Sequence, residues 1–178
     1  MDNERRPRPL NAEALWNRAL RALGSRAQTI AELREKLLRR AERPEDVEPI
    51  LARLKEYGYL NDQRFAEGLA TARLENEGLG KIRVLRDLRK RRVAPKLAER
   101  VVDETYREAD ETRLIENFLR RKYRKQPLET VLAEPKNLAS AYRRLRAAGF
   151  RAASVHQVLH RLAKDRELLD SLAEAEEG

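Results

Sequence analysis

Apolar residues recur along most of this chain at spacings of three and four, which is the pattern of an amphipathic α-helix. The first such stretch predicts a helix over residues 11–23, with Asn11 as its N-cap and Gly24 at its end. A second helix is expected after Thr29. Glu32 follows at the spacing of a capping box, in which the hydroxyl and the carboxylate each accept a hydrogen bond from an otherwise unpaired backbone N–H.

A third helix is expected after Pro44, because proline suits the first turn of a helix. Pro49 removes a backbone donor, so it should bend this helix or delay its regular part. Gly58 then closes the first set of three helices. A second set follows, and its first helix is expected to break around Gly78 and Gly80.

The second and third helices of three successive sets align without a gap when Leu37, Leu88 and Leu145 are superposed, at offsets of 51 and 57 residues. The other matched positions are Leu33, Val84 and Ala141; Val47, Ala98 and Val155; Ile50, Val101 and Val158; Leu51, Val102 and Leu159; and Leu54, Thr105 and Leu162. The pattern predicts an all-α fold of three tandem three-helix repeats. Such repeats should form an elongated, curved array in which each small core depends on its neighbours.

The expected repeats span about fifty residues each: 11–60, 61–106 and 107–164. The longest insertion between matched helices is 126–136. Residues 1–10 are rich in Arg and Pro and should form a disordered N-terminal tail. Residues 165–178 carry six acids and one Arg, so we expect an acidic C-terminal tail that frays or folds back onto a basic surface.

Composition narrows the possible classes of protein. Charged residues make up 39% of the chain and its formal net charge is +9, which is typical of narrow helices with large solvated surfaces. The chain has no Cys, so disulfides and thiolate chemistry are excluded. The N-terminus has no apolar run like that of a signal peptide, and no stretch has eighteen successive apolar residues. We therefore expect a soluble cytoplasmic protein without a membrane partner.

Basic side chains gather opposite the apolar faces of several predicted helices. Nine basic and only two acidic residues lie between positions 81 and 100. The candidate binding residues are Arg83, Arg86 and Lys90 on one helix; Arg113, Arg120 and Arg124 on a helix expected over 113–125; and Arg143 and Arg144 further on. Arginines in rows can bind nucleic-acid phosphates with a steep salt dependence and little sequence preference. A solvated helix surface accounts for such a charge run equally well, and basic helices also bind acidic proteins.

The sequence offers no support for enzyme activity. It lacks a Gly-rich phosphate loop, a dinucleotide fingerprint and a nucleophile elbow. His156 and His160 have an i, i+4 spacing that can bind a metal, but Gln157 replaces a catalytic Glu and no third ligand is visible. We therefore expect neither a cofactor nor a metal. Sequence-specific reading by a helix-turn-helix is also disfavoured, because no helix presents obvious Asn or Gln base readers.

Three short motifs carry a resemblance to a known family. Gly58–Ala66, GYLNDQRFA, is similar to the GYLDDxxFA signature of the RecX family, bacterial regulators of the RecA recombinase. Thr29–Leu33 is similar to its SxxEL motif, and Leu145–Phe150, with Val155 and Val158 after it, to LxxRGFxxxxIxxVL. The chain departs from these patterns at three positions. It has Thr29 in place of Ser, Ala148 in place of the usual Arg, and Arg92 where a Gly often precedes the residue equivalent to Val93.

The resemblance covers about residues 12 to 163 and implies three tandem three-helix repeats that bind in the groove of the RecA–DNA filament. Such proteins restrain filament extension, ATP hydrolysis and strand exchange in recombinational repair and the SOS response. The implied partners are the RecA nucleoprotein filament and, weakly and non-specifically, single- and double-stranded DNA; we expect a monomer. The resemblance assigns no individual binding residue, so the candidate residues rest on charge alone. A nucleic-acid packaging protein and a helical protein-binding scaffold are the alternatives.

Overall fold

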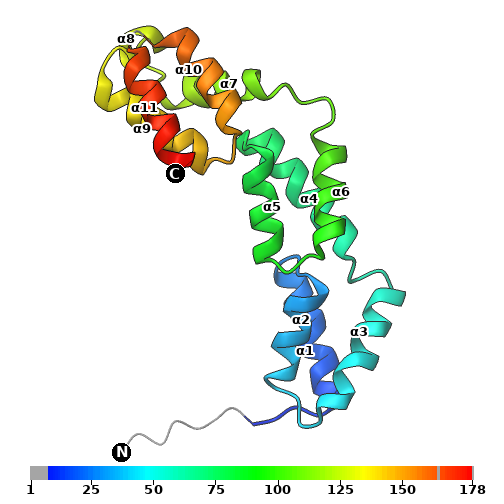
Figure 1. The fold of residues 1–178 in the computed structure, drawn as a ribbon. Helices are drawn as coiled ribbons and strands as arrows, with labels where there is room; N and C mark the ends of the chain where they lie inside the picture. Colours follow the sequence, from blue (N-terminus) through cyan, green and yellow to red (C-terminus); the bar gives the residue numbers. More distant parts are fainter. Residues whose placement is uncertain (1–7, 164, 178) are drawn as a thin grey trace, which may run out of the picture. The chain divides into compact units, whose positions relative to one another are not determined.

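The computed structural model describes residues 8–163 and 165–177, and in this part of the chain regular structure is helical (Figure 1). The aligned helices are α1 (Ala12–Ser25), α2 (Ile30–Leu38) and α3 (Val47–Glu56); α4 (Asp62–Ala72), α5 (Lys81–Lys90) and α6 (Pro95–Thr105); and α7 (Glu111–Lys122), α9 (Pro135–Ala147) and α10 (Ala152–Leu162). The described residues form no β-strand, although an isolated bridge pairs Leu10 with Ala41. The predicted all-α fold of three-helix repeats is confirmed.

The first two helices begin where their caps predict. Asn11 Oδ1 accepts a hydrogen bond from the backbone N–H of Ala14, at 3.0 Å. At the start of α2, Thr29 Oγ1 accepts from the N–H of Glu32, and Glu32 Oε2 accepts from the N–H of Thr29, both at 3.2 Å. Both predicted helix starts are therefore confirmed, because these side chains satisfy backbone donors that a helix start leaves unpaired.

The end of α1 differs from the prediction. Gly24 does not end the helix, which continues to Ser25. Two side chains, Ser25 Oγ at the end of the helix and Gln28 Nε2 in the turn, donate to the carbonyl of Ala22 at 2.9 and 2.6 Å. The turn thus satisfies a carbonyl of the last helical turn with side chains, without a left-handed glycine at position 24.

The regular part of the third helix of the first repeat begins late, which is one of the two outcomes predicted from Pro49. Pro44 opens a short 3-10 turn, η1 (Pro44–Asp46), and the regular helix α3 begins only at Val47. Pro49 then lies in the first turn of α3. An N–H at that position would lack a partner within the α-helix, so its absence costs little.

The aligned apolar positions form the interior of the repeats. Leu37, Leu88 and Leu145 are fully buried, and the other apolar residues matched before the last column are buried as well, with exposures of 7% or less. The last column is looser, because Thr105 and Leu162 are only half-buried. The hydroxyl of Thr105 donates to the carbonyl of Val101 at 2.8 Å, which explains how a polar residue is accommodated there.

The chain divides into two compact units. The N-terminal unit contains the chain up to residue 68 together with 88–98, and the C-terminal unit contains 69–87 and the chain from 99 onward. The core of the N-terminal unit includes Leu15, Ala19, Leu33, Leu37, Leu51 and Leu54, and that of the C-terminal unit includes Ile115, Leu119, Leu138, Tyr142, Phe150 and Leu159. Helices α4, α5 and α6 each contribute residues to both units. The repeat boundaries 11–60, 61–106 and 107–164 stay predictions.

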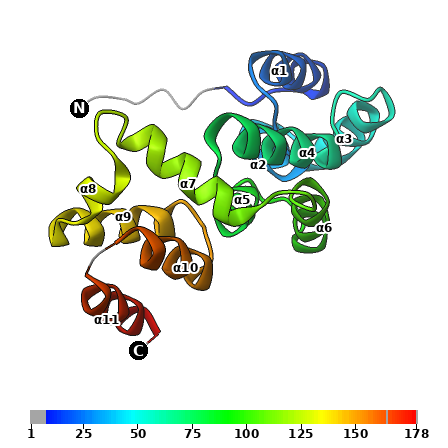
Figure 2. The same cartoon turned by 90° about the horizontal axis from the view of Figure 1, so that it is seen from above.

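The acidic stretch 165–178, predicted to fray or to fold back as a tail, is largely helical over its described residues. Helix α11 (Arg166–Glu177) packs against α9 and α10 (Figure 2). Leu169 is fully buried, and Leu168 and Leu172 pack against the same core. These leucines lie at helical spacing, so burial of their stripe outweighs the tendency of neighbouring acids to stay in water. The predicted disorder of residues 1–10 concerns mainly 1–7, which lie outside the described residues.

The insertion in the third repeat is also partly ordered into a helix. A five-residue helix, α8 (Leu128–Leu132), lies within 126–136 and contacts α9 and α10. Its residues Leu128, Val131 and Leu132 are buried. Within the described ranges, every helix is too short or too polar to cross a lipid bilayer.

Candidate functional site

Helix α5 has the two faces that its sequence predicts. Val84 and Leu88 are fully buried, whereas Arg86 and Lys90 are exposed. Neither cation forms an ion pair with a carboxylate of the described residues. Their charges are therefore open to an external anion.

Arg83 differs from the other members of the predicted stripe, because the protein itself binds its guanidinium. Its Nε lies 3.1 Å from Oδ1 of Asp87, and its Nη1 donates to the carbonyl of Ala147 at 3.3 Å. Asp87 is 9% exposed, and its other carboxylate oxygen lies 3.2 Å from Nε of Arg73. The side chain of Arg83 is 39% exposed, but its guanidinium is held by the protein itself, since a buried carboxylate needs cationic partners.

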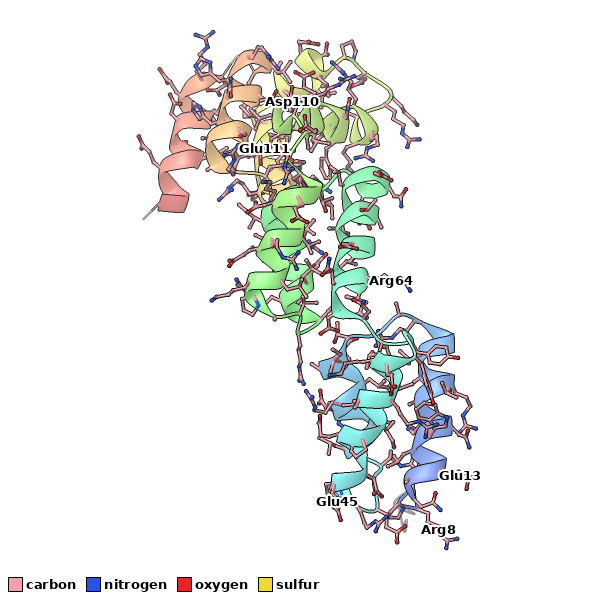
Figure 3. The ribbon with its side chains drawn as sticks, turned by 90° about the vertical axis from the view of Figure 1, so that its right-hand side faces the viewer. Arg8, Glu13, Glu45, Arg64, Asp110 and Glu111 are labelled. Carbon is pink, nitrogen blue, oxygen red and sulfur yellow. The ribbon has the colours of Figure 1, made fainter. Side chains whose placement is uncertain are left out.

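Arg113 is exposed in the first turn of α7, where the N-cap residue organises the backbone. Asp110 Oδ1 accepts hydrogen bonds from the hydroxyl and N–H of Thr112, at 2.7 and 2.9 Å, and from the N–H of Arg113, at 3.2 Å. The hydroxyl of Thr112 is the largest of the causes that lower the pKa of Asp110. Figure 3 labels Asp110 and Glu111 at this start of α7, and the exposed Arg113 in the same turn forms no ion pair with a described residue.

Arg120 is exposed but already has an anionic neighbour. It lies 3.2 Å from Glu116 one turn earlier, and the same carboxylate pairs with Arg161 of α10. A carboxylate shared by two guanidinium groups reduces the charge that Arg120 can offer to a polyanion.

The predicted helical stripe of α7 ends before Arg124. The helix stops at Lys122 instead of continuing to Lys125, and Arg124 lies in the following turn. Its Nε donates to the carbonyl of Arg121 at 3.1 Å. The helical spacing that grouped Arg124 with Arg113 and Arg120 therefore does not apply, although Arg124 is exposed.

Helix α9 carries the remaining two candidates on its exposed side. Arg143 makes no ion pair with a described residue, and Arg144 Nε lies 3.4 Å from Oγ of Ser140. The bond from Arg83 to Ala147 joins α5 to the end of this same helix. Within the C-terminal unit, the structure thus brings the start of the α5 stripe beside the end of α9.

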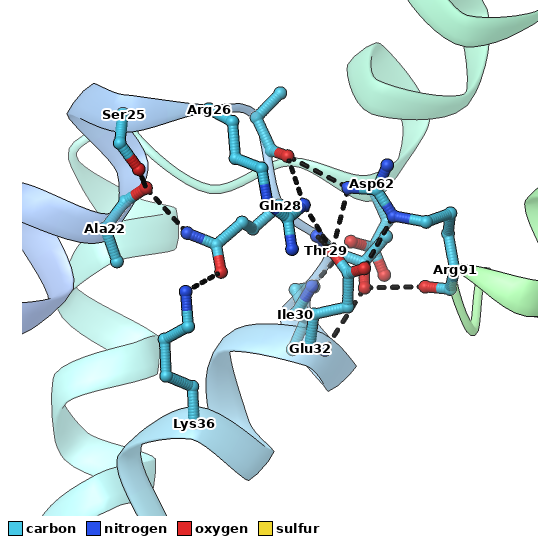
Figure 4. A network of polar contacts seen from close by, with 11 residues as sticks. Ala22, Ser25, Arg26, Gln28, Thr29, Ile30, Glu32, Lys36, Asp62 and Arg91 are labelled. Carbon is cyan, nitrogen blue, oxygen red and sulfur yellow. Dashed lines mark hydrogen bonds and ion pairs between the residues drawn. The ribbon is translucent and has the colours of Figure 1, made fainter.

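A second polar network, in the N-terminal unit, was not among the predicted sites (Figure 4). Arg91 forms a two-pronged ion pair with Glu32, with Nε to Oε1 at 2.5 Å and Nη2 to Oε2 at 3.0 Å. Burial raises the pKa of Glu32, but hydrogen bonds from Arg91 and the Thr29 N–H outweigh it, so the net pKa is lowered. Asp62 accepts from the N–H of Ile30 at 2.8 Å and so helps to cap α2. Only the capping box within this network had a sequence signal.

Glu111 has a comparable structural role at the start of α7. It accepts hydrogen bonds from Nε of Arg151 at 2.7 Å and from Oγ of Ser154 at 2.5 Å. Burial raises the pKa of Glu111, but the hydrogen bonds from Ser154 and Arg151 lower it by more. The pKa of Glu111 therefore lies below its ordinary value. The carboxylate is thus occupied in joining α7 to α10.

The histidine pair also contacts its own fold. His156 Nε2 lies 2.7 Å from Oδ1 of Asp170 in α11, and the rings of His156 and His160 have centroids 5.6 Å apart. Within the described residues, no group of three potential ligands could hold a metal ion.

The candidate cations that form no ion pair with a described residue are Arg86, Lys90, Arg113 and Arg143. Their side chains can donate hydrogen bonds to phosphate or carboxylate oxygens.

Comparison with known proteins decides the family. Two family models match the chain: RecX, first three-helix domain, over residues 16–54, and RecX, second three-helix domain, over 61–102. The chain is 35% identical over 170 residues to the regulatory protein RecX of Deinococcus radiodurans, covering 92% of this chain and 78% of that protein. The chain belongs to the RecX family. The RecX of Trichlorobacter lovleyi is 31% identical over 143 residues, covering 80% of this chain and 92% of that protein.

Solved RecX structures share the fold. The crystal structure of a regulatory protein RecX superposes with a TM-score of 0.62 at 21% identity, covering 84% of this chain and 71% of that chain. RecX from Lactobacillus salivarius superposes with a TM-score of 0.54 at 17% identity, covering 92% of this chain and 95% of that chain. The family resemblance carried by the three sequence motifs is confirmed, and the protein is a RecX-family regulatory protein.

Proposed function

We propose that the protein regulates the RecA recombinase by binding the RecA–DNA filament and restraining filament extension, ATP hydrolysis and strand exchange. The observation that carries this proposal is membership of the RecX family across nearly the whole chain. The regulated process would be recombinational repair and the SOS response. The protein acts by binding, and its own residues carry out no reaction on RecA or DNA.

The exposed cations supply the chemistry for such binding. A nucleoprotein filament displays DNA phosphates and acidic side chains along its length. Arg86 on α5, Arg113 on α7 and Arg143 on α9 are exposed, and none forms an ion pair with a described carboxylate. Several weak contacts made together gain from effective concentration, so affinity for assembled filament exceeds affinity for free RecA or bare DNA.

The test measures RecA ATP turnover and strand exchange on single-stranded DNA while the protein is added at concentrations too low to coat the DNA. Both rates should fall. The double variant Arg86→Glu with Arg113→Glu should require roughly tenfold more protein for the same inhibition, because two attractive contacts become repulsive. Rates that stay unchanged with folded protein would contradict the proposal and favour a packaging protein or scaffold.

A matched control separates specific contacts from overall charge. Arg21 and Arg64 are also exposed and unpaired with described carboxylates, and they lie in α1 and α4. The variant Arg21→Glu with Arg64→Glu changes the net charge by the same amount as the test variant, and inhibition should change little. Equal loss in both variants would mean that total charge, and not the α5 and α7 cations, determines inhibition.

A further inference from the structure

An aromatic cluster with two exposed rings lies in the N-terminal unit. The ring of Trp16 in α1 contacts the ring of Tyr57, with centroids 6.1 Å apart. The ring of Tyr57 in turn contacts that of Tyr59, with centroids 6.3 Å apart. Both pairs are edge-to-face, at 85° and 88°. Tyr57 and Tyr59 are 53% and 59% exposed, although the chain as a whole has only 5% aromatic residues. Burial in a core does not explain these two rings.

The guanidinium of Arg53 lies over two of the three rings, those of Trp16 and Tyr57. The Cζ atom of Arg53 lies 4.4 Å from the centroid of Trp16 and 5.5 Å from that of Tyr57. Arg53 is exposed and forms no ion pair with a carboxylate in the described part of the chain. Stacking orients its planar guanidinium while leaving the N–H donors without an anion, so the side chain is preorganised to bind one.

We propose that Trp16, Arg53, Tyr57 and Tyr59 form a stacking site for the bases of single-stranded nucleic acid. Aromatic faces that bind bases, combined with an arginine that binds the adjoining phosphate, are the chemistry by which proteins hold single strands without reading sequence. The N-terminal unit also carries more Lys and Arg than Asp and Glu. Tryptophan, tyrosine and arginine are also common in protein interfaces, but the cationic excess of this unit and the unpaired guanidinium of Arg53 favour an anionic strand.

The site differs in mechanism from the basic stripes. Binding at the stripes depends on phosphate charge and is strongly weakened by salt. Binding at the aromatic cluster depends in addition on base stacking, so it requires unpaired bases. It also needs no RecA, so the site goes beyond the proposed regulatory function.

The chain contains one tryptophan, Trp16, which makes the cluster its own reporter. The experiment titrates the full-length protein with an oligothymidylate of roughly ten nucleotides, a length within the range of known single-strand sites, and follows tryptophan emission. Emission should be quenched to saturation. An abasic oligonucleotide of the same length and charge, and a duplex of the same length, should produce much weaker quenching.

Alanine variants test which side chains carry the binding. Tyr57→Ala and Tyr59→Ala should each weaken oligothymidylate binding roughly tenfold, because each removes a stacking face. Tyr59→Phe retains the ring and should bind like the wild type. Leu38→Ala removes another exposed apolar side chain of the same unit, 43% exposed, and serves as the control. Circular dichroism should show unchanged helix content in all four, since these side chains are exposed.

The possible failures are distinguishable. If the abasic oligonucleotide binds as well as oligothymidylate, or if both tyrosine variants bind normally, the stacking site is ruled out. If Tyr57→Ala weakens association with RecA but not with the oligonucleotide, the cluster is a protein-docking surface and the proposal is also wrong. Charge reversal at Arg86 and Arg113 should weaken RecA inhibition while leaving the oligothymidylate quenching intact, so the two proposals can fail independently.

Discussion

At two junctions between successive repeats, equivalent positions of the chain are in contact, but different chemical groups make the contacts. In each, the start of a repeat's second helix contacts the turn between the second and third helices of the next repeat. Thr29 Oγ1 donates to the carbonyl of Arg91 at 2.7 Å, and Gly80 N donates to the carbonyl of Ala148 at 2.9 Å. Thr29 and Gly80 are equivalent in the alignment that superposes Leu37, Leu88 and Leu145, and so are Arg91 and Ala148. The first junction lies in the N-terminal unit and the second in the C-terminal unit.

The first junction is held mainly by charged side chains. Arg91 pairs with Glu32, donates to the carbonyl of Ala27 at 3.0 Å, and lies over the ring of Phe65, with Cζ 4.6 Å from the ring centroid. Thr29 meanwhile completes the capping box with Glu32. One carboxylate thus caps its own helix and binds the next repeat.

The second junction is held by backbone contact that glycine permits. Gly149 has φ +88°, and a Cβ there would lie 2.2 Å from the backbone N of Arg83. A Cβ on Gly80 would lie 2.2 Å from the carbonyl oxygen of Gly149, and Ile82 N donates to that oxygen at 3.2 Å. The difference between the junctions means that the first should respond to charge and pH, whereas the second should respond to added volume.

The largest effect is expected for Gly149→Ala in the second junction. The added methyl must displace the backbone of α5 and also occupy the left-handed region, so the free energy of unfolding should fall by about 3 kcal/mol. Urea unfolding followed by far-ultraviolet circular dichroism measures it. The control is Gly68→Ala in α4, where nothing lies within 4 Å of the added atom; it should raise stability by up to about 1 kcal/mol. A Gly149→Ala protein as stable as the wild type would contradict the steric account.

A smaller loss is expected for Arg91→Ala in the first junction. Removing the guanidinium leaves Glu32, whose side chain is 18% exposed, without its main partner, and should cost about 2 kcal/mol. The matched control is Arg34→Ala. Arg34 also forms a two-pronged pair, with Glu48, but these side chains are 40% and 63% exposed, so the loss should be at most about 0.5 kcal/mol. Equal losses in the same urea assay would show that burial does not strengthen the junction pair.

The pH dependence should separate the junctions as well. The folded pKa of Glu32 lies below its ordinary 4.5, so its stabilising contribution is present above about pH 4.5 and is lost as pH falls through the folded pKa. The difference in unfolding free energy between wild type and Glu32→Gln should therefore be constant near neutral pH and shrink in acid. The penalty of Gly149→Ala is steric and should not follow this curve. An unchanged Glu32→Gln difference in acid would contradict the lowered pKa.

The smallest effect concerns Arg92, which occupies the position in the second repeat that Gly149 occupies in the third. Its φ is 58°, a left-handed conformation that is costly for a side chain with a Cβ. Arg92→Gly should raise the free energy of unfolding by about 0.5 kcal/mol, the relief of strain being partly offset by greater freedom of the unfolded chain. The variant also loses an exposed ion pair with Glu35, 2.6 Å in length, which is worth little. A loss above 1 kcal/mol would show that this ion pair stabilises the turn.

Local sequence determined most of the helices and their interior. The capping box of Thr29 and Glu32, the delay at Pro49 and the columns through Leu37, Leu88 and Leu145 were all predictable, because capping and amphipathic burial depend on residues within one or two turns. The basic face of α5 followed from the same periodicity. The leucines of α11 also have a visible helical spacing, but the acidic composition around them drew attention away from a helix that packs on α9 and α10.

Contacts distant in sequence decided which charged groups remain available to a ligand. Arg83 lies on the predicted stripe, yet the approach of Ala147 and the burial of Asp87 occupy its guanidinium. Arg91 and Glu32 are 59 residues apart, and nothing in either local sequence indicates that they pair. A helix period shows on which side of its own axis a side chain lies, whereas pairing and desolvation depend on which other segment packs against that side. The sequence therefore determined the faces of the helices, and only the tertiary structure decided which cations on those faces remain open to an external anion.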